Sequence, residues 1–337
     1  MAFKPKRVMF EQAALEYPLG SQLYQRFKHE QVPVSMIGSH NRVTGIPGKN
    51  PVDAWREGKA TLVVGVRKTL DFSTCKPSAH YQLPLYTGCP GKCEYCYLMT
   101  TLGNKPYLRT YVNLEEIFNQ AEQYIHRRSP ELTVFEGAAT SDPVPLEAYT
   151  GALAKTITFF AKQPLGRFRF VTKFTAIEPM LDLEHAGHTT VRFSINTERV
   201  IDQWEHATPK LALRVQAAQQ IMAAGYPLGF IVAPIFLLPH WQEEYLALLH
   251  TLRQTLNAQP QVFEFISHRF TTAAQTRINA VFPESTLPMT PAERRYKYGQ
   301  FGYGKYVYPK ETLSSAETWL RQQTQSLFPD SQILYFV

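Results

Sequence analysis

The chain has 337 residues, of which 44% are hydrophobic and 19% are charged, and its formal net charge is +7. These proportions are typical of a globular protein that is long enough to bury a full-sized core. No run of 18 apolar residues occurs, and the first residues lack the apolar segment of a signal peptide, so we expect no transmembrane helix and a cytoplasmic location. The basic excess is compatible with a nucleic-acid partner but also with none.

The first part of the chain reads as an extension that precedes the main fold. Residues 1–60 are irregular in pattern, with one short helix expected near residues 11–27. Residues 61–68, Thr-Leu-Val-Val-Gly-Val-Arg-Lys, predict a strand because of their apolar run. We therefore expect an N-terminal α/β extension over residues 1–75.

From residue 81, short apolar runs alternate with amphipathic segments. The expected strands are residues 81–86, 132–137, 168–173, 191–196, 228–235 and 262–267. The expected helices are residues 114–127, 146–162, 211–224 and 243–256, with a weaker one at 177–184. Such alternation predicts a parallel sheet covered by helices. Six units make an open, partial (β/α)6 barrel over residues 76–270, with ligands at the carboxyl ends of its strands.

The alternation stops after residue 270. Residues 291–298 predict a basic, aromatic helix, and in residues 298–310 glycines alternate with aromatic residues, which is typical of a hairpin. A closing helix is expected at residues 316–327 and a last strand at 333–337. Residues 271–337 are thus expected to form a separate C-terminal region.

Three cysteines lie within eight residues, in the pattern Cys-x3-Cys-x2-Cys: Cys89, Cys93 and Cys96. Three thiolates on one short loop can hold three irons of a [4Fe–4S] cluster and leave the fourth iron without a protein ligand. An open iron can bind a small molecule, which in radical S-adenosylmethionine (SAM) enzymes is SAM. The spacing therefore predicts a reaction type before any other feature is considered.

Other kinds of metal site fit this spacing less well. A zinc site usually needs four ligands, and His80 lies unusually far upstream for a compact zinc knuckle. An electron-transfer cluster normally has a fourth cysteine, and the distance of Cys75 fits neither ferredoxin pattern. A disulfide is disfavoured in a chain with four cysteines and no secretory signal. We rank the radical SAM interpretation first and zinc second.

Several stretches together resemble the spore photoproduct lyase family, the DNA repair enzymes of bacterial endospores. The resemblance implies a partial (β/α)6 barrel, a [4Fe–4S] cluster, SAM, and DNA that contains the thymine dimer 5-thyminyl-5,6-dihydrothymine. The stretches include Ala14-Leu-Glu-Tyr-Pro-Leu-Gly, Ile46-Pro-Gly-Lys-Asn, Thr100-Thr-Leu-Gly-Asn-Lys-Pro-Tyr, Arg169-Phe-Val-Thr-Lys-Phe, Arg192-Phe-Ser-Ile-Asn, Gly225-Tyr-Pro-Leu-Gly-Phe-Ile-Val-Ala-Pro and His268-Arg-Phe-Thr.

The same resemblance implies the cofactor contacts. Cys89, Cys93 and Cys96 would bind the cluster. An ammonium group needs hydroxyl or carbonyl acceptors and a carboxylate favours a lysine, which suits the amino acid end of SAM. The Gly-Gly-Glu element that is usual in radical SAM enzymes is absent, and Asp142 fits an N-cap of the following helix. The implied SAM contacts are Tyr95, Ser141, Lys173 and Ser194. Ala233, on an apolar strand, either lines the SAM pocket through its backbone or packs in the core.

The hydrogen donor is where the chain departs most clearly from the family. Most members carry a cysteine where this chain has Ala139, and many carry a serine where it has Cys75. The reaction needs a weak X–H bond beside the product radical, and a thiol provides one. We hypothesise that Cys75 is the donor, with a buried apolar role as the alternative. The resemblance also places Tyr97 in the radical relay.

The DNA contacts are expected in the C-terminal region, where basic side chains can neutralise phosphates and aromatic rings can stack on a displaced base. In the family a hairpin wedge carries Arg-Tyr where this chain has Gln300 and Phe301. Packing of some rings on the barrel is the alternative. The predicted DNA-binding residues are Gln300, Phe301, Lys305, Lys105 and Arg109.

The implied reaction removes the C6 hydrogen of the lesion, splits the methylene bridge by β-scission and returns two thymines. It further implies a reducing electron donor of the flavodoxin or ferredoxin type and a place in the spore core. Two other functions stay open at this point. They are another radical SAM enzyme that acts on nucleic acid or a small molecule, and a metal-stabilised nucleic-acid-binding protein.

Overall fold

The computed structural model describes residues 3–299, 302 and 304–337. The chain divides into two compact units. The first comprises Met1–Pro90 and Leu102–Val191, and the second comprises Gly91–Thr101 and Arg192–Val337. Among the described residues, no helix combines the length and apolar character that are needed to cross a bilayer.

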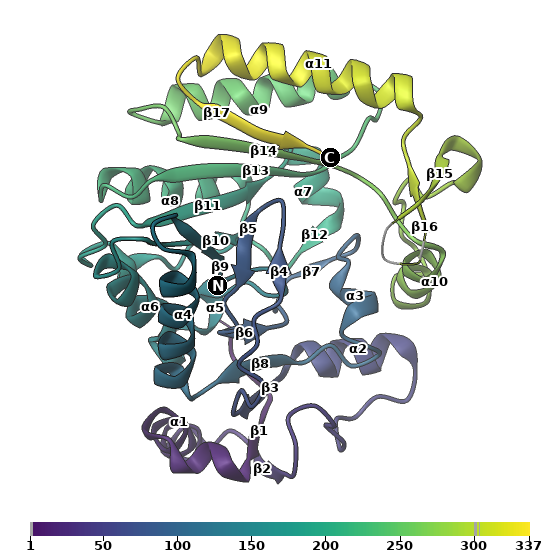
Figure 1. The fold of residues 1–337 in the computed structure, drawn as a ribbon. Coiled ribbons are helices and arrows are strands. Elements are labelled where there is room, and N and C mark those ends of the chain that lie inside the picture. The colour runs from purple at the N-terminus through teal and green to yellow at the C-terminus, as the bar shows by residue number, and fades with distance from the viewer. Residues whose placement is uncertain (1–2, 300–301, 303) are drawn as a thin grey trace. The chain divides into compact units, whose positions relative to one another are not determined.

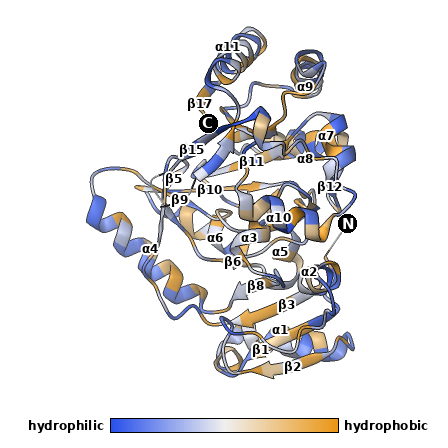
Figure 2. Cartoon of the chain, turned by 90° about the vertical axis from the view of Figure 1, so that its right-hand side faces the viewer, coloured by the Kyte–Doolittle hydropathy of each residue, from blue (hydrophilic) through white to orange (hydrophobic). Residues whose placement is uncertain are grey.

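The first unit contains a five-stranded sheet in the order β2-β1-β3-β8-β6. The pairs β1–β2, β1–β3 and β3–β8 are parallel, whereas β6 runs antiparallel to β8. Every residue of β3 is buried, so this strand reads as a continuous apolar run, and Figure 2 shows β1 and β3 as hydrophobic. The elements are β1 (Arg7–Glu11), β2 (Val34–Ile37), β3 (Thr61–Gly65), β6 (Tyr86–Thr87), β8 (Leu108–Tyr111), α1 (Pro18–His29) and α2 (Pro51–Lys59).

This sheet corrects two expectations. Residues 1–60 are not irregular, because they supply two strands and two helices of the unit. The strand expected at residues 81–86 is two strands, β5 (Ala79–Gln82) and β6, which belong to different sheets. Pro84 lies between them and has no backbone N–H to donate, which explains why one ladder cannot continue.

A second set of strands in the first unit follows the expected alternation. β9 (Thr133–Glu136) pairs in parallel with β10 (Gly166–Thr172) and with β5, and β5 pairs antiparallel with β4 (Thr74–Cys75). Buried aromatic rings fill the space beneath the helices, with the Phe160 and Phe168 centroids 5.4 Å apart. The helices are α4 (Leu114–Arg128), α5 (Val144–Thr150) and α6 (Ala152–Ala161).

Two helices expected in this region differ from the prediction. Residues 146–162 form α5 and α6 rather than one helix, because Gly151 adopts a left-handed conformation with φ of 57°. Residues 177–184 form only the 3-10 turn η2 (Glu178–Met180). Strand β11 (Thr189–Ile195) then contains the boundary between the two units.

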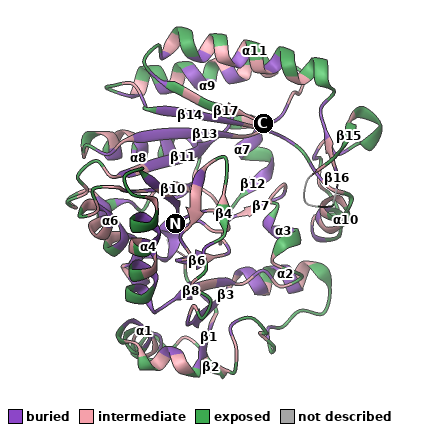
Figure 3. Cartoon of the chain, viewed as in Figure 1, coloured by how far each residue is buried: buried purple, intermediate pink, exposed green. Residues whose placement is uncertain are grey.

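The second unit contains the parallel strands β13 (Leu228–Ile235), β14 (Val262–Ser267) and β17 (Gln332–Phe336). β13 and β14 are mostly buried, and Figure 3 shows them in purple, whereas much of the outer helix α11 is exposed. Helices α9 (Trp241–Thr255) and α11 (Lys310–Leu327) lie side by side in Figure 1, with the Trp241 and Trp319 rings 5.1 Å apart. α7 (Glu198–Trp204) and α8 (Leu211–Ala223) complete this part.

The cysteine loop and a hairpin also belong to the second unit. β7 (Lys92–Cys93) pairs antiparallel with β12 (Glu205–His206), and α3 (Leu98–Thr101) contacts α10 (Thr272–Val281). The helix expected at residues 291–298 is wrong. These residues form a 3-10 turn, η3 (Pro291–Glu293), and a strand, β15 (Arg295–Tyr298), which pairs antiparallel with β16 (Gly304–Val307). The alternation of basic and aromatic residues in β15 has the period of a strand.

Candidate active site

The first cysteine of the motif follows a tightly packed turn in the first unit. Gly88 has φ of 82°, and a Cβ there would lie 2.6 Å from the carbonyl oxygen of Tyr107, so only glycine fits. The backbone N–H of Gly88 donates to the carbonyl oxygen of Thr140 at 2.9 Å, and Gly88 forms an isolated parallel β-bridge with Ser141. The backbone oxygen of Cys89 accepts a bond of 2.7 Å from Lys59 Nζ. The start of the cysteine loop is therefore paired with the segment that carries Ser141.

The other two cysteines lie in the second unit. Cys93 is buried and lies opposite Glu205 in the β7–β12 pair, while the Glu94 N–H donates to the Trp204 carbonyl at 2.9 Å. The Cys96 N–H donates to the Cys93 carbonyl at 3.3 Å, which curls the loop just before α3. The second half of the cysteine loop is therefore held by backbone bonds to β12.

A [4Fe–4S] cluster fits this loop by the chemistry of its donors. Cysteine thiolates are the usual ligands of iron–sulfur clusters, and three of them leave one iron open. Cys89 and Cys96 are partly exposed, so the loop is accessible from outside. Within the described residues, no three His, Cys, Asp or Glu side chains are grouped closely enough to share a metal ion. The fit therefore rests on the identity and spacing of the three thiols.

A buried ionic network surrounds Tyr95 in the second unit. The Tyr95 hydroxyl donates to Glu205 Oε1, and Arg214 Nη2 lies 2.6 Å from Glu205 Oε2. The side chains of both charged residues are completely buried. Burial first, and then the charge of Glu205, raises the pKa of Tyr95 well above its usual value. Tyr95 is therefore a neutral phenol that is held in one orientation by its acceptor.

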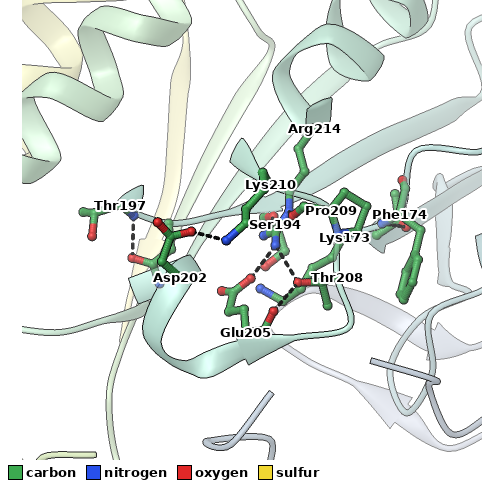
Figure 4. A network of polar contacts seen from close by, with 12 residues as sticks. Lys173, Phe174, Ser194, Thr197, Asp202, Glu205, Thr208, Pro209, Lys210 and Arg214 are labelled. Atoms are coloured by element: carbon green, nitrogen blue, oxygen red, sulfur yellow. Dashed lines mark hydrogen bonds and ion pairs between the residues drawn. The ribbon is translucent and has the colours of Figure 1, made fainter. Parts of the chain in front are cut away.

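The same guanidinium reaches the backbone at Ser194. Arg214 Nη1 donates to the Ser194 carbonyl at 3.0 Å, and further bonds go to the Thr208 hydroxyl and the Pro209 carbonyl, both at 2.9 Å. Figure 4 shows Arg214 directed toward Glu205, Thr208 and Ser194. The chain around Ser194, near the end of β11, is thus tied to the residues beside the cysteine loop.

Ser141 and Lys173 lie in the first unit, on either side of a buried carboxylate. Asp142 accepts bonds from the Thr172 hydroxyl at 2.7 Å, the Lys173 N–H at 2.9 Å and the Val144 N–H at 3.3 Å. Burial raises the pKa of Asp142 to about 6 despite these bonds. Pro143, rather than Asp142, is the N-cap residue of α5, so Asp142 serves chiefly to fix the end of β10.

Ala233 lies in β13 where the strand pairing is interrupted. The register with β14 shifts between Val232 and Ile235, which leaves the backbone of Ala233 outside the regular ladder. The neighbouring Pro234 carbonyl accepts a bond of 2.7 Å from Asn196. Ala233 is partly exposed, as a residue that offers its backbone to a ligand must be.

The two residues predicted to handle the product radical differ in setting. Cys75 ends the short strand β4, is partly buried and lies opposite Ala79. Ala139 follows β9 and is also partly buried. Tyr97 is 57% exposed, and its carbonyl accepts a bond of 2.9 Å from the Thr100 hydroxyl.

The predicted DNA-binding residues fall in three places. Gln300 and Phe301 lie outside the described residues. Lys305 lies opposite Lys297 in the β15–β16 hairpin, whose Tyr296 and Tyr298 are 54% and 70% exposed.

Lys105 and Arg109 lie in the first unit. The ammonium of Lys105 donates to the Ile46 carbonyl, while Arg109 donates to the hydroxyls of Tyr107 at 2.9 Å and Tyr111 at 3.1 Å. Both side chains therefore make bonds within the protein in addition to any contact with phosphates.

The sequence alone did not indicate the buried pair Arg214–Glu205 or the contacts of Glu94. A signal for Arg214 did exist, since it is the one charged residue within the largely apolar helix at residues 211–223. Glu94 and Glu205 gave no such signal, because each lies in a short segment without clear periodicity.

Comparisons with known proteins agree over the whole chain. The family model described as spore photoproduct lyase matches residues 3–337. A spore photoproduct lyase of Clostridium acetobutylicum is 48% identical over 98% of both chains. One from Bacillus subtilis is 45% identical over 99% of this chain and 98% of the relative.

Two solved structures are similar over their full length. A spore photoproduct lyase complexed with dinucleoside spore photoproduct has a TM-score of 0.98, 45% identity and full coverage of both chains. A double mutant with bound AdoMet (that is, SAM) and dinucleoside spore photoproduct has the same TM-score, identity and coverage. This likeness confirms the fold class expected from the sequence, an α/β partial barrel.

Proposed function

Because this chain belongs to the spore photoproduct lyase family, we propose that it reverts 5-thyminyl-5,6-dihydrothymine in DNA to two thymines by radical SAM chemistry. The observation that carries this proposal is the match over residues 3–337, together with the Cys-x3-Cys-x2-Cys loop inside it. A relative of nearly the same fold was solved with dinucleoside spore photoproduct, which supports the same substrate class for this chain.

The cysteine loop is the proposed site of the cluster. Cys89, Cys93 and Cys96 hold the [4Fe–4S] cluster, and the cluster and SAM, when bound, supply the carbon-centred oxidant that removes the C6 hydrogen of the lesion. The role of the chain is to orient these groups and exclude water. The residues proposed to bind SAM are Tyr95, Ser141, Lys173, Ser194 and Ala233.

Cys75 is proposed to supply the hydrogen atom to the product. Its S–H bond breaks, a C–H bond forms on the former bridge carbon, and the unpaired electron is left on sulfur. Tyr97 would then return a hydrogen atom to the sulfur: its O–H bond breaks, the S–H bond re-forms, and the unpaired electron is left on the phenoxyl oxygen of Tyr97.

A solved relative supports the donor assignment. That protein carries alanine in place of a cysteine and cysteine in place of a serine, and it was solved with AdoMet and substrate. These are the residue types that this chain has at Ala139 and Cys75.

The DNA contacts are proposed on the C-terminal hairpin and in the segment that follows the cysteine loop in the sequence. Exposed rings of β15 offer stacking surfaces, and a crosslinked dimer must leave the duplex before chemistry can reach it. The proposed contacts are Gln300, Phe301, Lys305, Lys105 and Arg109. A reducing flavodoxin or ferredoxin would deliver the electron. We place the protein in the spore core, since this lesion belongs to spore DNA.

Lesion reversal by anaerobically reconstituted protein tests the proposal. The protein is incubated with SAM, dithionite and dinucleotide spore photoproduct, and thymine-containing product is quantified by chromatography. We expect product with the natural chain and none with Cys89→Ala. SAM cleavage without product would instead indicate a radical SAM enzyme with a different substrate. Bound zinc in place of iron would favour the metal-stabilised binding protein.

A further inference from the structure

We propose that Glu205 and Arg214 are positioning residues that hold the second half of the cysteine loop and the backbone at Ser194 as one rigid piece. The inference rests on the proposed function, because it assigns a role toward the cluster and SAM. Both residues belong to the second unit, as do Tyr95, Cys93 and Ser194.

Arg214 joins separate segments of the chain from a fully buried position. Its guanidinium bonds to the Glu205 carboxylate at 2.6 Å and to the Ser194 carbonyl at 3.0 Å. Further bonds to Thr208 and Pro209, each 2.9 Å, hold the turn before α8. Because the guanidinium is planar and its donors are fixed in direction, these acceptors cannot move independently of one another.

Glu205 transmits this restraint to the cysteine loop. One carboxylate oxygen accepts from Arg214, and the other accepts from the Tyr95 hydroxyl. Its backbone lies opposite Cys93 in the β7–β12 pair. A single residue therefore touches a proposed iron ligand through its main chain and a proposed SAM contact through its side chain.

A second set of side-chain contacts holds the same loop. The carboxylate of Glu94 lies 2.6 Å from His206 Nε2 and accepts a bond of 2.5 Å from the Ser285 hydroxyl. The Glu94 N–H donates to the Trp204 carbonyl. β7 is thus held to β12 by side chains as well as by backbone pairing. The two sets of contacts differ in solvent exposure, since the side chain of His206 is partly exposed whereas that of Arg214 is completely buried.

The second unit offers a matched control for this network. Glu264 is also fully buried, pairs with buried Arg192 at 2.8 Å and accepts from the Tyr335 hydroxyl at 2.7 Å. This second network joins β11, β14 and β17 and contains no proposed cofactor residue, although Arg192 lies on the same strand as Ser194. Neither partner of the Glu264 carboxylate, Arg192 or Tyr335, belongs to the cysteine loop. Glu205→Gln and Glu264→Gln therefore each remove the charge of a buried carboxylate that binds one arginine and one tyrosine hydroxyl.

The experiment compares these two variants after anaerobic reconstitution. We expect both substitutions to lower the melting temperature by similar amounts. Only Glu205→Gln should release iron to a chelator at least tenfold faster and weaken the change that SAM causes in the EPR spectrum of the reduced cluster. The KM for SAM should rise with Glu205→Gln and stay unchanged with Glu264→Gln. Equal iron release and equal SAM responses would overturn the inference.

Two further comparisons keep the test decisive. If Glu205→Gln does not fold, Tyr95→Phe and its control Tyr335→Phe remove only the hydroxyl donor of each network. Because Tyr95 is itself a proposed SAM contact, iron release is the readout for this pair. Faster iron release with Tyr95→Phe than with Tyr335→Phe is expected, and equal release overturns the inference. Failure of the natural chain to bind iron would instead contradict the proposed function itself.

Discussion

The two units fix their proposed cofactor residues by different means. In the first, one buried carboxylate, Asp142, accepts from backbone and hydroxyl donors at the end of β10, beside Lys173. In the second, a buried pair of opposite charges, Arg214 and Glu205, joins Ser194 to the cysteine loop. Both arrangements are buried and both restrain the main chain. Only the second depends on two charged side chains of opposite sign.

Because of this difference, the two arrangements should respond differently to pH and to substitution. Burial raises the pKa of Asp142 to about 6, so this group can take up a proton in the folded protein and still accept hydrogen bonds. Removal of either partner from the Arg214–Glu205 pair leaves an uncompensated buried charge, which is far more costly. We therefore expect the first unit to respond to pH and the second to respond to substitution.

The largest effect on stability is expected from Glu205→Ala. The substitution leaves the guanidinium of Arg214 buried without its carboxylate, which typically costs about 3–5 kcal/mol. Urea unfolding of the apoprotein measures this loss without any contribution from the cluster. A cost below about 1 kcal/mol would remove the contrast between the two units.

A smaller effect, visible as a pH dependence, is expected from Asp142→Asn. The folded pKa of Asp142 is raised to about 6, above the ordinary value of 3.8, so the folded state binds this proton more tightly than the unfolded state. Stability from this group is therefore greatest below about pH 4 and falls by roughly 3 kcal/mol as the pH rises to about 6. Asp142→Asn should abolish this part of the fall in unfolding free energy.

Glu147 provides the control for that measurement. Burial raises its pKa to about 7, and it accepts from the N–H groups of Leu153 and Ala154 at the start of α6, remote in role from Lys173. Glu147→Gln should flatten the pH dependence at slightly higher pH and leave the KM for SAM unchanged. Identical pH profiles for the natural chain and Asp142→Asn would refute the assigned pKa.

The smallest effect on stability is expected from Cys75→Ala. Cys75 is only partly buried and takes no part in the Asp142 hydrogen bonds or the Arg214–Glu205 pair. We expect a change within about 1 kcal/mol, as is usual for sites without a buried network. The chemical effect should be large. In deuterated water the natural chain should place deuterium in the thymine methyl group through its exchangeable thiol, and Cys75→Ala should not. Equal deuterium content in both products would exclude Cys75 as the donor.

Local sequence patterns correctly predicted the buried strands and revealed the cysteine motif, since both can be recognised without knowledge of tertiary contacts. The apolar runs that became β13 and β14 are buried strands, and the cysteine motif needs no tertiary information to be read. The same reasoning mistook β15 for a helix, because a short basic and aromatic segment fits either period until its partner β16 is known. The helix expected at residues 146–162 failed at Gly151, whose left-handed backbone breaks it.

The candidate site was predicted only in its residue types. Asp142 was interpreted as a cap because the donors at Thr172 and Lys173 lie thirty residues along the chain and meet it only in the fold. Arg214 stood out as a charge in an apolar helix, yet its partners depend on β12 pairing with β7. Contacts that the tertiary structure creates leave no periodic signal in the sequence.

EPR spectroscopy of the reduced, anaerobically reconstituted protein shows whether the cysteine loop holds a cluster with one open iron. We expect the spectrum of a [4Fe–4S] cluster that changes when SAM is added, because three thiols leave one iron open to that ligand. A protein that binds zinc instead of iron, or a cluster whose spectrum is unaffected by SAM, would contradict this expectation.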